Sequence, residues 1–364
     1  MSAHNILFLH KCFVLGGGIE RVHQNLAHAI ARQNVAPYFF VLNAEGDSES
    51  GYASLQSTFR TGRAPVNASF SGKVNAVFAW IKDNEIDFII AATEQANTVA
   101  FLCKLRLPKL QIIYTRHCAF DVSDQKLPAW AIKLLYSFYA LNGKIVCVSK
   151  ALQTQLQNAI LHNKARVHFV PNAVVDESLY EKAEQNSDNW QCVDYFIAVG
   201  RLVEQKGFDL LISAYAQALA QDPQLPDLAI VGEGEDKHQL SQLINQLGVQ
   251  DKVILTGFTH NPYYPIKHAK ALILSSRHEG MPTVLIEAIA LDTPVIAFDC
   301  PTGPGEIVVS GKNGQLVSHL QVGELAQAIL AYRDLPTHHI RQYVDHFEYA
   351  NVAKAYLSLY EGAS

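Results

Sequence analysis

Two cations stand close together in the second half of the chain. Arg201 and Lys206 belong to the segment GRLVEQKG, which directly follows an apolar run typical of a strand. Such a pair can hold a diphosphate, because the planar guanidinium binds two oxygens at once and the ammonium acts as a point charge. Two solvated surface cations would give the same pattern. The segment alone therefore leaves both interpretations open.

Two carboxylates, Glu279 and Glu287, stand in the segment RHEGMPTVLIE. Pro282 is typical of the first position of a helix, where a backbone N–H would have no partner anyway. The following residues would then lie in a first turn whose N–H groups point outward at the positive end of the helix. Glu287 lies among Ile and Ala, and a carboxylate there is costly to bury unless it accepts hydrogen bonds, for instance from sugar hydroxyls.

A glycine loop follows the first predicted strand. Gly16, Gly17 and Gly18 allow close backbone approach, and the helix that begins after them offers free N–H groups to a phosphate. A dinucleotide fingerprint G-x-G-x-x-G would need a further glycine where Arg21 stands, which disfavours a nicotinamide-dependent oxidoreductase. The loop is also compatible with a simple tight turn between strand and helix.

The cysteines and the hydropathy pattern indicate the compartment. The 6 cysteines are far apart and form no CxxC pair, so we expect neither a disulfide framework nor a structural zinc site. The first apolar run, residues 6–9, is shorter than the core of a signal peptide. No stretch reaches the roughly 18 apolar residues that span a bilayer. We therefore expect a cytoplasmic protein that is soluble or peripheral at a membrane.

The arrangement of apolar runs predicts an α/β fold. Short β-branched and aromatic runs alternate with stretches that have helical spacing of apolar residues, and most runs are continuously apolar, as in parallel strands covered on both faces. The predicted strands are residues 5–10, 37–42, 88–92, 110–117, 143–149, 167–170, 195–200, 227–232, 252–257, 270–275, 294–298 and 314–317. They divide best into two doubly wound sheets, with the polar residues 176–189 as a linker.

Together these segments resemble the retaining glycosyltransferases of family 4, which have the GT-B fold. The resemblance depends on the glycine loop, G-R-L-x-x-x-K-G at 200–207, V-G-x-G at 231–234, T-G-F at 256–258 and the E-x7-E pair Glu279 and Glu287. Residues 299–307, DCPTGPGEI, look like those of bacterial surface-polysaccharide members. The resemblance implies two Rossmann-like doubly wound parallel-sheet domains facing a cleft.

The resemblance also implies the domain limits. Residues 1–175 would form an acceptor-binding domain, and residues 176–345 would form the nucleotide-sugar donor domain. The tail resembles the final helix of the family, which crosses back onto the first domain. We therefore expect a C-terminal helix at about 346–364 to complete the N-terminal domain.

In the second domain, the resemblance assigns roles by position. Arg201 and Lys206 would hold the donor diphosphate and stabilise the leaving nucleotide. Glu287 would bind the ribose hydroxyls, and Glu279 would face the transferred sugar. Glu306 is a further candidate on the donor side. Backbone groups that would approach the sugar and phosphate belong to Gly280, Met281, Pro282, Thr283 and Val284.

In the first domain, the resemblance concerns the glycine loop and one histidine. Gly16, Gly17 and Gly18 would close over the phosphates. Family members have a His near the sugar after the fourth predicted strand, and His117 stands there. The Asp that often follows is replaced by Cys118. His117 is therefore either a catalytic residue or a structural histidine.

The implied activity is that of a hexosyltransferase in the EC 2.4 class. A hexose or N-acetylhexosamine would pass with retention from a nucleotide sugar, UDP by resemblance, to a lipid-linked or lipopolysaccharide glycan. The chain has no D-x-D motif, which suits metal-independent transfer, and we expect no cofactor besides the nucleotide-sugar substrate. The alternatives are a GT-B nucleotide-sugar epimerase, an NAD-dependent oxidoreductase and a non-catalytic sugar-nucleotide-binding subunit.

The net charge of −5 conceals a division between the halves. Residues 1–175 carry 17 Lys and Arg against 10 Asp and Glu, a net +7, whereas residues 176–364 carry 12 against 24, a net −12. Residues 127–144, LPAWAIKLLYSFYALNGK, combine aromatic and aliphatic side chains with flanking lysines. They predict either a helix on an anionic membrane surface or a core helix. A basic first domain suits a lipid-linked diphosphate glycan, and no feature indicates nucleic acid.

Overall fold

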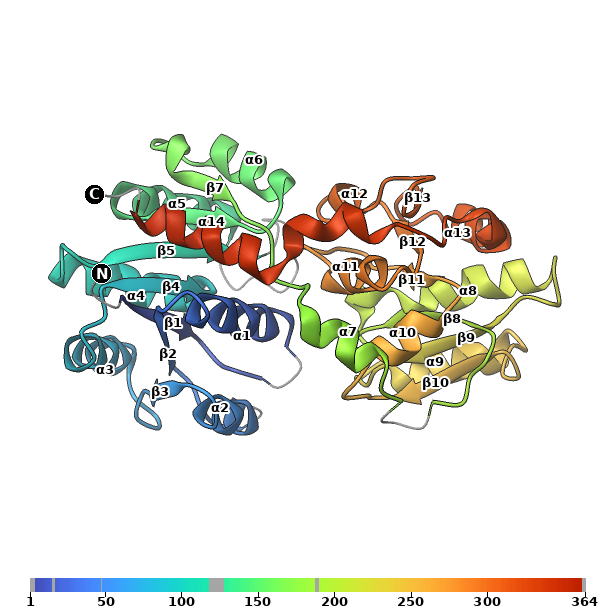
Figure 1. The fold of residues 1–364 in the computed structure, drawn as a ribbon, viewed down its shortest axis with the longest axis horizontal. Coiled ribbons are helices and arrows are strands. Elements are labelled where there is room, and N and C mark those ends of the chain that lie inside the picture. Colours follow the sequence, from blue (N-terminus) through green and yellow to red (C-terminus); the bar gives the residue numbers. More distant parts are fainter. Residues whose placement is uncertain (1–3, 15–16, 47, 118–127, 187–189, 362–364) are drawn as a thin grey trace. The chain divides into compact units, whose positions relative to one another are not determined.

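The computed structural model describes residues 4–14, 17–46, 48–117, 128–186 and 190–361 (Figure 1). The chain divides into two compact units. Unit 1 comprises Met1–Ala173 together with Tyr349–Ser364, and unit 2 comprises Val174–Glu348. The last segment of the chain therefore returns to the first unit, and each unit has its own sheet and apolar core.

Unit 1 contains a seven-stranded sheet in the order β3-β2-β1-β4-β5-β6-β7. Its strands are β1 Asn5–His10, β2 Ala36–Val41, β3 Arg60–Arg63, β4 Phe88–Ala92, β5 Gln111–Arg116, β6 Lys144–Cys147 and β7 Val167–Phe169. All neighbours pair in parallel. The chain order reverses between β1 and β4, and ligands of such sheets bind at the carboxyl ends of the strands near this point.

Strand β3 is not among the predicted strands. Its sequence, RTGR, has no apolar run or alternation that would indicate a strand. It forms because the edge of β2 offers unpaired backbone groups, and Arg60 and Arg63 lie over the rings of Tyr38 and Tyr52. The sheet of unit 1 therefore has one strand more than the sequence predicted.

Helices cover the sheet of unit 1. They are α1 Gly18–Ala31, α2 Ser48–Gln56, α3 Phe70–Asp83, α4 Glu94–Arg106, α5 Ala129–Asn142, α6 Lys150–Ala159 and α14 Tyr349–Glu361, with a 3-10 turn at Lys164–Arg166. One apolar core joins the sheet to α1, α2 and α14. Against another part of the sheet, Tyr139 of α5 stacks on Tyr114 of β5 with ring centroids 4.5 Å apart. Burial on both faces explains why β4 is apolar throughout.

The C-terminal helix α14 is part of the fold of unit 1 (Figure 1). Val352 and Tyr356 are buried in the core that contains α1. At the far end of the helix, the Tyr360 hydroxyl donates to Asp87 Oδ2 at 2.8 Å, and Lys144 Nζ donates to the Leu359 carbonyl. These contacts anchor the last turns of the chain to the sheet.

Unit 2 contains a six-stranded parallel sheet in the order β10-β9-β8-β11-β12-β13. Its strands are β8 Tyr195–Val199, β9 Asp227–Val231, β10 Val253–Gly257, β11 Leu272–Leu274, β12 Val295–Phe298 and β13 Gly314–Val317. Its helices are α7 Glu177–Ala183, α8 Phe208–Leu219, α9 Lys237–Gln246, α10 Tyr263–His268, α11 Thr283–Ala290, α12 Pro304–Ile307 and α13 Val322–Leu330, with 3-10 segments at Glu204–Lys206, Tyr332–Asp334 and Arg341–Phe347. The prediction of two Rossmann-like doubly wound sheets is confirmed.

The prediction that residues 176–189 form a linker is wrong for residues 177–183, which form a helix of unit 2. Helix α7 begins at Glu177, and its Leu179 and Ala183 are buried in unit 2. Asn261 donates to the Lys182 carbonyl at 2.8 Å, which attaches the end of α7 to the loop before α10. The polar composition misled the prediction because only two side chains of this short helix face the core.

No helix in the described parts of the chain is both long and apolar enough to cross a membrane. Helices α1, α3 and α5 have 14 residues each. A spanning helix needs about 20.

Candidate active site

The cationic segment 200–207 leaves the carboxyl end of β8 and forms a short 3-10 turn before α8. Gly207 ends this turn in the left-handed region, with φ +62, and a Cβ there would overlap the Ser275 carbonyl oxygen. The Ser275 hydroxyl donates to the Lys206 carbonyl at 3.1 Å. Glycine is therefore required where this loop presses against the loop that follows β11.

The glycine loop after β9 supports the cationic segment from another side. Gly232 has φ +148, and a Cβ there would overlap the Gly200 carbonyl oxygen. Leu202 donates its backbone N–H to the Glu233 carbonyl at 2.9 Å and accepts one from Asp236 at 3.0 Å. Backbone bonds thus hold the first residues of the cationic segment, whose Arg201 side chain is exposed.

Arg277 ties the two strand-end loops to each other. Its guanidinium binds both carboxylate oxygens of Asp209, at 2.7 and 2.8 Å, and donates to the Glu204 carbonyl at 2.8 Å. Partial burial opposes ionisation of Asp209, but the hydrogen bonds and charge of Arg277 more than offset it and hold the pKa of that carboxyl below its ordinary value. The sequence analysis did not identify this pair, because its members are 68 residues apart.

Glu279 is held through one of its two carboxylate oxygens. Lys206 Nζ lies 2.7 Å from Oε1, and the buried Ser276 hydroxyl donates to the same atom at 2.7 Å. Among the described residues, Oε2 has no hydrogen-bond partner. Thr302 fixes the backbone by donating to the Glu279 carbonyl. The arrangement leaves one oriented acceptor oxygen on a side chain that is 8% exposed.

Helix α11 begins directly beyond this loop. Its N-cap is Pro282, which supplies no side-chain acceptor to the first turn, and the Thr283 and Val284 side chains are half-buried. Glu287, one turn further, is 3% exposed and lies on a helix whose other residues from Leu285 onward are buried as well. The expectation that Glu287 is not an ordinary exposed helix residue agrees with this burial.

Unit 2 therefore brings several of the predicted residues to one end of its sheet. Lys206 and Glu279 are in direct contact, and Gly280–Val284 continue from Glu279 into α11. Arg201 lies on the loop that contains Lys206, and Glu306 lies in the short helix α12 after β12. The sequence analysis missed Ser276, although a hydroxyl three residues before a predicted site carboxylate was a usable signal.

In unit 1, the glycine loop is described from Gly17 onward, and Gly16 lies outside the described residues. Gly17 is the N-cap of α1 and Gly18 its first residue. The Glu20 carboxylate lies against the position that a Gly17 Cβ would occupy. The positive end of α1, where the sequence predicted a phosphate, thus already has a negative side chain beside it.

His117 follows β5 directly, and its hydrogen bonds define its tautomer. The Thr115 hydroxyl donates to the Ala91 carbonyl at 2.8 Å, so it has no second proton to give. In the 2.9 Å hydrogen bond between the two residues, His117 Nε2 must therefore donate to the Thr115 hydroxyl oxygen. Nε2 carries the proton, and Nδ1 is left as an acceptor.

Two buried histidines lie beside His117, and the sequence analysis identified neither. His10 ends β1 and His23 lies on α1, with His23 Nδ1 3.1 Å from His10 Nε2. The rings of His23 and His117 have centroids 5.5 Å apart. Burial is the main cause that lowers the pKa of all three histidines, and neighbouring positive charge lowers it further. The pKa is about 3 for His10 and about 4 for His117. The pKa of His23 lies well below its ordinary value. The three rings are neutral at neutral pH.

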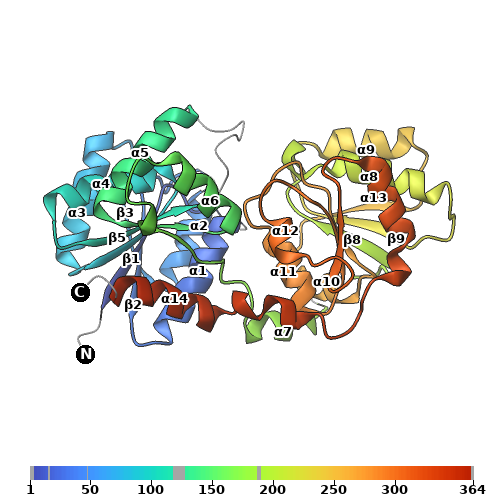
Figure 2. The ribbon, with the colours of Figure 1, turned by 90° about the horizontal axis from the view of Figure 1, so that it is seen from above.

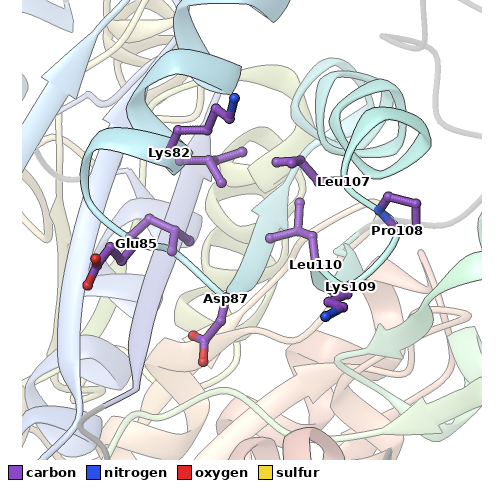
Figure 3. Close-up of a pocket in the computed structure, with 9 residues that line it drawn as sticks. Lys82, Glu85, Asp87, Leu107, Pro108, Lys109 and Leu110 are labelled. Carbon is purple, nitrogen blue, oxygen red and sulfur yellow. The ribbon is translucent and has the colours of Figure 1, made fainter.

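Outside these loops, unit 1 has a hollow of about 550 Å³ at the amino ends of β4 and β5 (Figure 3). Its walls come from the end of α3 and from the loop between α4 and β5, with Lys82, Asp87 and Lys109 at its border. None of the predicted site residues lines it. Ligands of parallel sheets bind at the carboxyl ends, so this hollow is not the candidate active site.

The described residues contain no group of three or more His, Cys, Asp and Glu side chains placed to hold a metal ion. The neighbouring histidines His10, His23 and His117 are arranged ring against ring instead. Whether the reaction needs a metal stays a prediction from the sequence.

Both parts of the chain match known glycosyltransferase families. Residues 16–178 match the family described as Glycosyltransferase Family 4, and residues 181–343 match Glycosyl transferases group 1. The two parallel-sheet units have the fold of GT-B glycosyltransferases. The chain belongs to these glycosyltransferase families, as the sequence predicted, and is an enzyme of the hexosyltransferase type.

Individual relatives support this membership. The lipopolysaccharide 1,6-galactosyltransferase of Salmonella typhimurium is 36% identical over 329 residues, which are 85% of this chain and 84% of that protein. The amylovoran biosynthesis glycosyltransferase AmsD of Erwinia amylovora is 28% identical over 333 residues, 90% and 89% of the two chains. The crystal structure of Anabaena HepE in complex with UDP and glucose has a TM-score of 0.81 at 19% identity, covers 98% and 99%, and shows the same fold.

We expect Ser276→Ala to lower the rate of sugar transfer by about 10- to 100-fold, because a hydrogen bond to a charged group contributes about 1.5–3 kcal/mol. Loss of the hydroxyl leaves Glu279 oriented by Lys206 alone. Nucleotide release in the presence of acceptor measures the rate, and thermal melting checks the fold. Ser241→Ala, at a half-buried position of α9 whose hydroxyl donates to the Lys237 carbonyl of its own helix, is the control. An unchanged rate in Ser276→Ala would show that the hydroxyl does not position Glu279.

Because His10 and His117 are buried and have a lowered pKa, we expect unit 1 to lose stability in weak acid. Between pH 6.5 and about 4 the unfolded chain binds protons on His10 and His117 that the folded chain cannot bind. The free energy of unfolding should therefore fall as pH falls through this range, by up to about 1.4 kcal/mol per pH unit for each histidine. Thermal melts at several pH values measure the decline.

A variant distinguishes this cause from general acid destabilisation. His23→Phe removes one titrating ring and keeps an aromatic side chain in the core, so its melting temperature should decline less steeply than that of the wild type. The exposed His338, changed to Asn, is the control and should follow the wild type. Parallel declines in wild type and His23→Phe would contradict the assignment.

Proposed function

We propose that the protein is a retaining, metal-independent glycosyltransferase. It moves a hexose or N-acetylhexosamine from a nucleotide sugar, UDP-linked, to a growing lipid-linked or lipopolysaccharide glycan. The observation that carries the proposal is the contact of Lys206 with Glu279, which places a cation and a free carboxylate oxygen side by side at the end of a doubly wound sheet. The names of the relatives, which include a lipopolysaccharide galactosyltransferase and an amylovoran glycosyltransferase, support the acceptor class.

The donor diphosphate would bind at the cationic segment. Lys206 and the exposed Arg201 lie on one loop, and the backbone N–H groups at the start of α11 follow the next loop. When the bond between the sugar and the phosphate breaks, negative charge develops on the leaving diphosphate. Fixed donors of this kind stabilise such charge by about 3–4 kcal/mol each. The complex of HepE with UDP and glucose supports a UDP-linked donor.

The transferred sugar would hydrogen-bond to Glu279. Oε1 is occupied by Lys206 and Ser276, so Oε2 is the atom that accepts from a sugar hydroxyl. Glu287 would accept from the ribose, and its burial suits a carboxylate that is compensated by hydroxyl donors. In unit 1, taken by itself, Nδ1 of His117 would accept a hydrogen bond from a neutral hydroxyl, since the ring carries no charge.

Retention would follow from a same-face reaction. The bond between the anomeric carbon and the diphosphate oxygen breaks, and the acceptor oxygen forms its new bond on the same face. The acceptor proton passes to the departing diphosphate oxygen, so no protein base is required. Lys206 stabilises the diphosphate until that proton arrives. The protein would work in the cytoplasm, peripheral at the inner face of the membrane that holds such acceptors.

A panel of UDP- and GDP-sugars, with and without a lipid-linked or lipopolysaccharide acceptor, tests the function. We expect Lys206→Ala and Glu279→Ala each to lower acceptor-dependent nucleotide release by about 100- to 1000-fold. Lys237→Ala removes a lysine from an exposed ion pair with Glu233 and is the matched control. The anomeric configuration of the product reports retention, and a chelator should leave the rate unchanged.

Several outcomes would contradict the proposal. Full activity in both site variants would exclude the site. Nucleotide release without acceptor, accompanied by a change of sugar epimer, would indicate an epimerase, and donor binding without release would indicate a non-catalytic binding subunit. An inverted product or a rate abolished by the chelator would overturn the corresponding part of the mechanism.

A further inference from the structure

Helix α5 buries one apolar face and exposes another. Four of its side chains, at most 1% exposed, face the interior of unit 1: Ile132, Tyr136, Tyr139 and Ala140. Four large apolar side chains are exposed by 70%, 43%, 46% and 51%: Trp130, Leu134, Phe138 and Leu141. A helix that is apolar all round is normally buried all round, whereas this helix has water on its second apolar face.

The exposed side chains form one continuous stripe. Their spacing of four, four and three residues places them within about 80° of one another around the helix axis, at about 100° per residue. Single exposed apolar residues are ordinary, but a contiguous exposed row marks an interaction surface. Figure 2 shows α5 at the border of unit 1, beside α4.

The segment that follows α6 extends this stripe. Leu161, 76% exposed, donates its backbone N–H to the Ser137 hydroxyl of α5 at 3.1 Å. Asn163 donates to the Ala140 carbonyl at 3.1 Å, and Arg166 donates to the Leu141 carbonyl at 3.4 Å. Residues 161–166 thus run along α5 and add one apolar side chain and two exposed cations, one of them Lys164, to the same surface.

We define the α5 patch as the side chains of the stripe, Leu161 and three exposed cations beside them. It consists of Trp130, Leu134, Phe138, Leu141, Leu161, Lys133, Lys164 and Arg166. Residues 129–142 and 160–166 contain no Asp or Glu. Within the described residues, no carboxylate lies within 4 Å of the charged nitrogens of Lys164 or Arg166. The patch therefore combines apolar surface with exposed cations.

More positive charge lies close behind the patch. Burial, together with the charge of Arg166, lowers the pKa of both Lys104 and Lys144. These lysines are occupied by backbone carbonyls, since Lys104 donates to Pro108 at 2.7 Å and Lys144 donates to Leu359. The field at the patch is accordingly positive, and an anionic partner would relieve the mutual repulsion.

We propose that the α5 patch docks on an anionic lipid bilayer. An anionic bilayer can bind both parts of the patch at one surface. Its hydrocarbon would contact the apolar stripe, and its anionic headgroups would pair with the cations. Trp130 and Phe138 suit the boundary between headgroups and acyl chains, and Lys and Arg extend from that boundary to the headgroups. This inference rests on the proposed function, because docking would bring the enzyme to a lipid-linked acceptor.

Sedimentation with vesicles tests the docking with the full chain. Wild type should bind vesicles of phosphatidylcholine with 30% phosphatidylglycerol at least tenfold more tightly than vesicles of pure phosphatidylcholine, and 0.5 M salt should weaken the binding. The double variant Phe138→Ser and Leu141→Ser removes apolar surface, and the double variant Lys164→Glu and Arg166→Glu reverses charge. Each should lower the partition coefficient at least tenfold.

Matched controls come from unit 2. Leu247→Ser with Phe258→Ser replaces two exposed apolar residues, and Lys237→Glu with Lys312→Glu reverses two exposed cations. Both should bind vesicles like the wild type. Patch variants that bind vesicles like the wild type would overturn docking by this patch, and so would binding that does not depend on lipid charge. A dimer in size-exclusion chromatography that the apolar patch variant dissociates would also overturn it.

Nucleotide release with a lipid-free acceptor glycan separates the two proposals. The patch variants should retain this activity, because they leave the site in unit 2 unchanged. Absent vesicle binding with intact transfer overturns the docking alone. If the patch variants bind vesicles more weakly than the wild type but the wild type transfers sugar from no donor, the proposed function alone is overturned.

Discussion

The contact between Lys206 and Glu279 depends on two strand-end loops that are far apart in sequence. Its members are 73 residues apart, and the 2.7 Å distance exists only because Gly207 lets the first loop touch the second. The Arg277–Asp209 ion pair and the Ser276 hydroxyl then hold the second loop and its carboxylate. The site in unit 2 is therefore preorganised by contacts within the protein. Under the proposed function, little reorganisation would remain to be done when substrate charge develops.

The two units place opposite electrostatic environments at their strand ends. Unit 2 lies in the acidic half of the chain, yet the loop after β8 carries the cations Arg201 and Lys206. Unit 1 lies in the basic half, yet His10 at the end of β1, His117 after β5 and His23 on α1 are neutral imidazoles. Burial makes them neutral. Net charge alone would have predicted the reverse distribution.

Helix α5 shows how one composition can serve two roles. Its residues supply both the buried rings that pack on β5 and the exposed stripe that forms the patch. The sequence predicted either a core helix or a membrane-surface helix, and the structure shows one buried face and one exposed apolar face on the same helix. The cations of the patch are only partly those of the predicted stretch 127–144, because its last residue, Lys144, is bound to α14. Lys164 and Arg166 come from a neighbouring segment instead.

The sequence by itself determined the elements and the loops that carry chemistry. Continuous apolar runs specify buried parallel strands, and the E-x7-E spacing, Pro282 and the cationic segment are local patterns. Tertiary structure decided what local patterns cannot encode: strand β3 paired at a sheet edge, helix α7 in place of a linker, and Ser276 beside Glu279. It also decided the burial that neutralises the histidines. The reason is physical, because hydrogen bonding, desolvation and exposure depend on which distant segments pack together.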